Sequence, residues 1–149
     1  MSFFNYLTFF HVLFMALFTG SFAAMALLWA RGRGARSPQE RAPFVEGTLA
    51  ISRRLTTLTA SLLLLVGILM IIDMPGLLYE GPLIHIKITI GVILVGVSHV
   101  VHFRLKKAYA ALHQEEPEAG ADRFLDLATA LVPAVAFITI FLGIIQSHG

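Results

Sequence analysis

Residues 3–29 read FFNYLTFFHVLFMALFTGSFAAMALLW, without a single Lys, Arg, Asp or Glu. An α-helix needs about 20 apolar residues to cross the ~30 Å hydrocarbon layer of a bilayer. Because backbone groups in lipid must hydrogen-bond within the segment, the stretch is predicted to be a helix. It is about twice as long as the ~7–15-residue apolar part of a signal peptide, and no basic segment precedes it. We therefore expect a true membrane span.

The rest of the chain repeats this composition at residues 55–73, 83–103 and 124–146, which hold only three charged side chains between them. The whole chain is 57% hydrophobic and 13% charged, with a mean hydropathy of +0.80. Soluble domains are about 45–50% apolar and about 25% charged, so a soluble globule and a disordered chain are both excluded. The sequence predicts an all-α integral membrane protein, a four-transmembrane-helix bundle that forms a single domain over residues 1–149.

The basic side chains indicate how this bundle lies in the membrane. Ten of the eleven Lys and Arg residues lie within residues 30–54 and 104–123, which include the two connections predicted as loops, 30–48 and 104–123. The two termini and the loop 74–82 contain none. Short loops rich in Lys and Arg stay in the cytoplasm. Both termini are therefore predicted to face outward.

Two ionisable residues lie deep in the predicted spans, and such residues are functional candidates because they are costly in lipid. His11 lies about eight residues into the first span, and Lys87 is the only charged residue well inside any span. With the N-terminus outside, both fall in the outer half of the membrane. His11 is either a ligand of a bound group or a histidine hydrogen-bonded to a neighbouring helix. Lys87 is either a functional group or a lysine that extends to the headgroups.

A second group of candidates lies in the third span and at the start of the second. His85 precedes His99 by 14 residues, so the two project within about 40° of each other and ~21 Å apart, a spacing that suits two stacked haems or two unrelated histidines. His102 lies three residues after His99. Arg53 and Arg54 occupy the same inner level and either pair with haem propionates or anchor the helix.

Other features narrow the chemistry. The chain has no Cys, so thiolate metal sites are excluded and redox chemistry requires a bound cofactor. Trp29 and Tyr79 fit interfacial aromatic belts, and Asp126 fits a solvated helix end. Gly91 and Gly96 either allow close helix packing or leave room for a flat macrocycle. No nucleic-acid partner is expected, because the basic residues are accounted for by topology.

Three motifs resemble a known family. They are Phe10-His11 followed by Thr19-Gly20, then Ser52-Arg53-Arg54-Leu55, and most specifically Leu83-Ile84-His85-Ile86-Lys87-Ile88-Thr89. From Tyr6 to about Ile145 the chain resembles the bacterial membrane-integral protoporphyrinogen oxidases of the J type. The resemblance implies a bound haem b, with His11 and Lys87 as the functionally critical pair. The chain differs from the family in two respects: it lacks the Pro-Gly of the second helix and the fifth hydrophobic segment of many members.

The expected function is therefore membrane redox chemistry resembling the oxidation of protoporphyrinogen IX. His11 and Lys87 are the candidate catalytic residues, and His11 and His99 the candidate iron ligands of one haem b, or of two. Further cofactor-binding candidates are His85, His99, His102, Arg53 and Arg54. The resemblance implies a multi-pass protein of the bacterial inner membrane, with a tetrapyrrole, a redox partner or quinone, and the lipid bilayer as partners. A non-enzymatic electron-transfer subunit of a respiratory assembly, a homo-oligomer, and a structural subunit without cofactor remain open.

Overall fold

The computed structural model describes residues 2–79, 81–114 and 122–146, with only the helical backbone described for residues 141–146. Nearly all of these residues are helical, and the described part contains no strand. In chain order the elements are α1 (Phe3–Arg33), α2 (Pro38–Ile51), the π-helix η1 (Ser52–Thr56), α3 (Thr57–Asp73), the 3₁₀-helix η2 (Pro75–Tyr79), α4 (Pro82–His113) and α5 (Arg123–Gln146).

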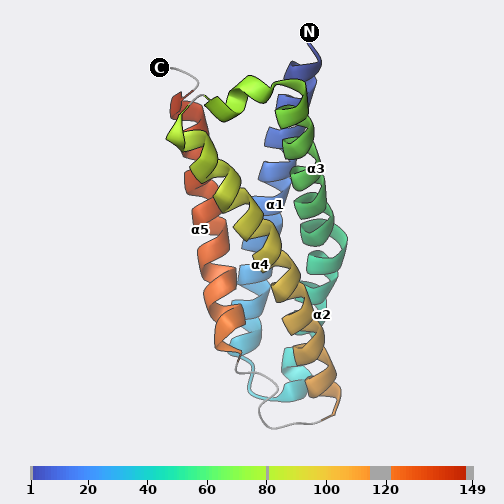
Figure 1. Ribbon diagram of the computed structural model, residues 1–149. Helices are drawn as coiled ribbons and strands as arrows, with labels where there is room; N and C mark the ends of the chain where they lie inside the picture. Colours follow the sequence, from blue (N-terminus) through green and yellow to red (C-terminus); the bar gives the residue numbers. More distant parts are fainter. Residues whose placement is uncertain (1, 80, 115–121, 147–149) are drawn as a thin grey trace.

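Four helices are long and apolar enough to cross a membrane, which confirms the predicted all-α architecture of a multi-pass membrane protein. The second of them combines α2, η1 and α3 into one run of 36 residues, Pro38–Asp73. α1 packs against both α3 and α5. α4 packs against the same two helices from the opposite side of the bundle (Figure 1). Among the described residues, the backbones of α1 and α4 do not approach each other, and neither do those of α3 and α5. The bundle is thus four-cornered, with α1 and α4 at opposite corners.

Most of the segment 30–48, predicted as a loop, is helical. α1 continues to Arg33, and α2 begins at Pro38. The Ser37 side chain accepts a hydrogen bond from the Glu40 backbone N–H at 3.2 Å, and the Glu40 carboxylate accepts one from the Arg36 N–H at 2.9 Å. This reciprocal arrangement is related to a capping box, and Pro38 occupies the first helical turn, where its missing N–H costs nothing.

The helices also extend past the predicted ends of the spans. The helix predicted to start at residue 55 begins at Pro38, and the one predicted to end at residue 103 continues to His113. Charged residues mark where a helix leaves the hydrocarbon layer, and they do not end the helix itself. In these extensions α2 packs against α4, with Val45, Leu105 and Leu112 buried and Lys106 and Lys107 exposed. Residues 124–146 were predicted to within one residue of α5.

The helices approach each other closely where α1 meets α2. A methyl group added at Gly32 would lie 3.0 Å from Phe44 Cβ, and one at Gly47 would lie 3.3 Å from Leu28 Cδ1. In a membrane such close approach supplies the van der Waals contact that drives helix association. The largest fully buried core side chains are apolar residues of α1, α4 and α5, namely Phe18, Phe22, Met25, Leu105 and Leu125.

The π-helix η1 makes polar contacts with α1 and with α4. The Thr57 backbone N–H donates to the Ser52 carbonyl five residues back, which widens the turn. Ser52 and Thr56 are fully buried, and the Thr56 hydroxyl donates to Ser21 Oγ of α1 at 3.0 Å. Arg53 and Arg54 lie between them in the sequence and are exposed. π-Helical turns inside longer helices occur frequently at functional sites.

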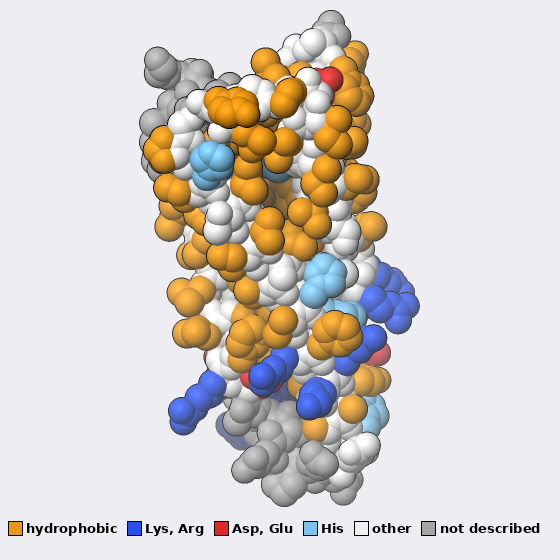
Figure 2. Space-filling model, in the orientation of Figure 1, with side chains coloured by type: hydrophobic (Ala, Val, Ile, Leu, Met, Phe, Trp, Pro, Cys, Tyr) orange, Lys and Arg blue, Asp and Glu red, His pale blue; other side chains and the backbone are white. Residues whose placement is uncertain are grey.

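The surface divides into two ends. Figure 2 shows hydrophobic side chains over most of the visible face, with Lys and Arg gathered toward the end where α1 passes to α2. Large apolar side chains such as Leu27, Phe103 and Phe137 are more than 60% exposed, which is the surface expected where lipid contacts a protein. The start of α1 and the end of α5 lie at the opposite end, beside η2 (Figure 1). We call the end where α1 passes to α2 the basic end, and the opposite end the η2 end.

Orientation in the membrane remains a prediction with a direct test. Reporter fusions are expected to place both termini outside and the segment around Arg36 inside, because the basic end should stay in the cytoplasm. Alkaline phosphatase and green fluorescent protein fused after Gly149 or inserted near Arg36 report the two sides. A C-terminus found inside together with an N-terminus found outside would contradict the four-span arrangement.

Candidate functional site

His11 faces the interior of the bundle from α1. It lies one turn after Leu7, which is buried, and seven residues before Phe18, which is also buried, so the three share one face of the helix. Its ring abuts α3, because a methyl group added at Gly67 would lie 4.0 Å from His11 Cε1. The Nδ1 atom of His11 is buried and has no hydrogen-bond partner. Since buried polar atoms are nearly always bonded, this nitrogen is suited to a ligand in the bundle interior.

Lys87 lies at about the same level of the bundle as His11. The register between the antiparallel helices is fixed by Ser52 Oγ and His102 Nδ1, which are 3.2 Å apart. Gly67 follows Ser52 by 15 residues and Lys87 precedes His102 by 15 residues, so Lys87 lies near the level of Gly67. Gly67 in turn contacts His11.

The face of α4 that carries Lys87 points inward. Lys87 is partly buried, and it precedes buried Leu94 by seven residues, or two turns. His11 and Lys87 therefore approach the interior from opposite corners of the bundle. The structure thus places the two residues at about the same level of the bundle, in the half that ends at η2.

Few side chains are buried around this layer. In α4 no side chain before Leu94 is buried, and in α1 Leu7 is the only buried side chain before Phe18. Gly91 lies one turn after Lys87, and a methyl group added there would meet nothing within 4 Å. α3 and α4 diverge toward the η2 end, where η2 crosses between them (Figure 1). An unpartnered buried nitrogen and the small number of buried side chains around it fit the binding of a large flat macrocycle.

His85 lies at a similar level but does not face the bundle interior. Its side chain is exposed and lies two residues before Lys87, on a different face of α4. Gly96 likewise faces outward, with nothing within 4 Å of an added methyl group. His85 therefore lies on the side of α4 that turns away from the core, whereas His99 is partly buried.

A second group of predicted residues meets nearer the basic end. The Nδ1–H of His99 donates to the Val95 carbonyl at 2.9 Å, which leaves Nε2 as the nitrogen that can accept a proton or bind a metal. His102 contacts Ser52, the residue immediately before Arg53. Arg53 and Arg54 are exposed. The π-helix thus places the two arginines beside the helix that carries His99 and His102.

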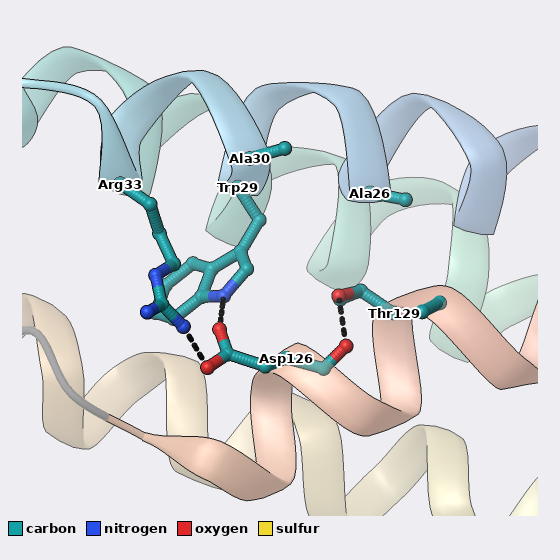
Figure 3. A pocket seen from close by; sticks show the side chains of 7 residues that line it. Ala26, Trp29, Ala30, Arg33, Asp126 and Thr129 are labelled. Atoms are coloured by element: carbon teal, nitrogen blue, oxygen red, sulfur yellow. Dashed lines mark hydrogen bonds and ion pairs between the residues drawn. The ribbon is translucent and has the colours of Figure 1, made fainter.

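A polar cluster between α1 and α5 was not predicted from the sequence. Asp126, expected to be solvated, accepts a hydrogen bond from Trp29 Nε1 at 2.8 Å and pairs with Arg33 (Figure 3). Trp29, expected in an interfacial belt, is only 3% exposed, and Arg41 lies over its ring. The signal was present, because Trp29 and Arg33 are one turn apart and Asp126 is the only acid in the last span.

Removing the hydrogen bond between Trp29 and Asp126 is expected to lower the stability of the folded protein measurably. Trp29→Phe removes the indole donor and leaves Asp126 Oδ1 without it, so we expect the free energy of unfolding to fall by about 1–3 kcal/mol. Unfolding in mixed micelles, followed by circular dichroism, measures the change. Asp126→Asn keeps an acceptor for Trp29 and loses mainly the exposed ion pair with Arg33, so its loss is expected to be smaller. A Trp29→Phe protein as stable as the unmodified chain would show that the hydrogen bond is unimportant.

Within the described residues, no group of three or more His, Asp or Glu side chains converges as a metal site. A haem iron needs only one or two protein ligands, so single histidines with a suitable nitrogen are the relevant candidates. No protein-family model matches the chain, and no curated protein or solved structure matches it either.

Proposed function

We propose that the protein is an integral membrane haem b protein with a redox function resembling that of the J-type protoporphyrinogen oxidases, and that the haem binds in the layer of His11 and Lys87. The observation that carries the proposal is the buried, unpartnered Nδ1 of His11 on the core-facing side of α1. The small number of buried side chains in the η2 half of α1 and α4 supports it, because a macrocycle needs space between helices that side chains do not fill.

His11 and Lys87 would have different tasks. His11 would hold the haem iron, because an imidazole nitrogen without another partner can bind iron without giving up a hydrogen bond. Lys87 is proposed as a second ligand or as a cation beside the propionates, approaching from the opposite corner of the bundle. When bound, haem supplies one-electron redox chemistry whose potential depends on its axial ligand and burial.

The chain also provides the surroundings that such a site needs. Phe10 and Phe14, which flank His11 in the sequence, stack with ring centroids 6.0 Å apart. A dry apolar environment strengthens the interaction of a lysine with an anionic group, since water screens it less. Lys87 is thus positioned to orient an anionic tetrapyrrole and to hold its charge away from lipid.

A non-enzymatic electron-transfer subunit is the second candidate. His99 favours it, because its Nδ1–H is fixed by the Val95 carbonyl and its Nε2 is left for a metal. His99 follows Lys87 by 12 residues, roughly 18 Å along α4 at 1.5 Å per residue. Two haems at these levels would form a relay across the membrane.

Expression in a bacterium that lacks protoporphyrinogen oxidase separates the two functions. The oxidase function predicts restored haem synthesis and oxidation of added protoporphyrinogen IX by isolated membranes. A well-expressed, haem-containing protein that fails in both assays would reject the oxidase function and favour electron transfer. The His11→Ala protein is the matched negative control.

A further inference from the structure

A pocket of about 330 Å³ lies between α1 and α5 near the basic end, separate from the layer of His11 and Lys87. Ala26, Ala30 and Ala130 form its apolar wall, and their small side chains leave the space open. Trp29, Arg33 and Asp126 form its polar end (Figure 3). The pocket therefore has an apolar part and a charged part.

The charge at the polar end favours an anion. Both oxygens of the Asp126 carboxylate are already used, one by Trp29 Nε1 and the other by Arg33. The last turn of α1 and the first turn of α5 together hold three arginines, Arg31, Arg33 and Arg123, against this one aspartate. The Arg33 side chain is 47% exposed, so its guanidinium, which has five N–H donors, is accessible beyond the ion pair.

The position of the pocket favours a lipid as the source of that anion. The flanking Leu27 and Leu127 are 67% and 61% exposed, as expected for side chains that face acyl chains. Arg33 ends α1 where the basic side chains gather, at the level of the headgroups. A bound molecule with an apolar tail along the alanines and a phosphate at Arg33 matches both parts of the pocket.

We propose that this pocket binds one anionic phospholipid from the leaflet at the basic end. One acyl chain lies along Ala26, Ala30 and Ala130, and the phosphate is held by Arg33. The lipid joins α1 to α5 beside the Trp29–Asp126 hydrogen bond. This binding is independent of haem and of the proposed redox function.

The test reconstitutes the full chain in vesicles of equal parts phosphatidylglycerol and phosphatidylcholine and counts retained lipids by native mass spectrometry after mild extraction. One phosphatidylglycerol per chain is expected to remain. Ala130→Leu fills the pocket and should abolish this retention, and Ala26→Leu should do the same from the other helix. Ala23→Leu is the matched control, since Ala23 is exposed on α1 and does not line the pocket. It should retain the lipid.

Arg33→Gln tests the headgroup contact. The preference for phosphatidylglycerol over phosphatidylcholine should fall about fivefold, the factor that corresponds to roughly 1 kcal/mol for a basic side chain near anionic lipid. Arg31→Gln, which removes a charge outside the pocket, should have a smaller effect. The proposal is overturned if the unmodified protein retains no lipid, if the folded Ala130→Leu and Ala26→Leu proteins retain it unchanged, or if Ala23→Leu loses it equally.

Discussion

A His11→Ala protein is expected to purify with little or no haem. The substitution removes the one buried imidazole nitrogen that lacks a partner in the described interior and that we assign to iron. Changes in groups that merely support a metal ligand cost about 10–100-fold in affinity, so loss of the ligand itself should cost at least that much. Haem content per chain and the spectrum of the reduced protein measure the effect. Haem that remains should be high-spin.

The matched control for His11→Ala is His85→Ala. His85 is exposed on the side of α4 that turns away from the core, so its loss should leave haem content unchanged. If His11→Ala keeps the normal haem content and reduced spectrum, the site near the η2 end is wrong. His99, whose Nε2 is left for a metal, would then be the first residue to replace.

A Lys87→Met protein is expected to lose porphyrinogen oxidation by a factor on the order of 10²-fold, comparable to the loss of one charge-stabilising donor in other enzymes. Methionine keeps a long unbranched apolar side chain in this partly buried position and deletes the charge with its N–H donors. The layer should therefore stay packed while an anionic tetrapyrrole loses its cation. Oxidation of protoporphyrinogen IX in membranes is the direct measurement.

Two further variants decide what Lys87 does. Lys87→Arg keeps the charge and should recover part of the activity if Lys87 acts as a cation, but none if its amine binds iron. Lys106→Met removes an exposed charge from the same helix and should be silent. Activity of Lys87→Met equal to that of Lys106→Met would remove Lys87 from the site.

The four spans were predictable because charged residues are so unevenly distributed along the chain. The same reasoning misplaced the helix ends, since Arg104 and Lys106 mark the edge of the hydrocarbon layer while α4 continues through them. The start of α2 was readable from Ser37 and Glu40, three residues apart, as in a capping box. The π-helix at Ser52 has no comparable signature, because it depends on contacts with α1 and α4.

The candidate site was predictable in part. Helical periodicity places His11 on the same face as Leu7 and Phe18, and depth in the span singles out Lys87. That the two share a layer depends on the register between helices, which the contact between Ser52 and His102 fixes. The sequence alone does not indicate which residues of different helices are in contact. The Trp29–Asp126 hydrogen bond was missed for the same reason, since it joins residues 97 positions apart.

The most direct measurement is the absorption spectrum of the protein purified in mild detergent, followed by a pyridine haemochrome assay. Binding of haem b at His11 predicts a Soret band and a b-type haemochrome, with haem content that falls when His11 is replaced. A folded, helical protein that is colourless after expression with ample haem supply would contradict haem binding. His11 would then be a histidine that packs against a neighbouring helix and binds no cofactor.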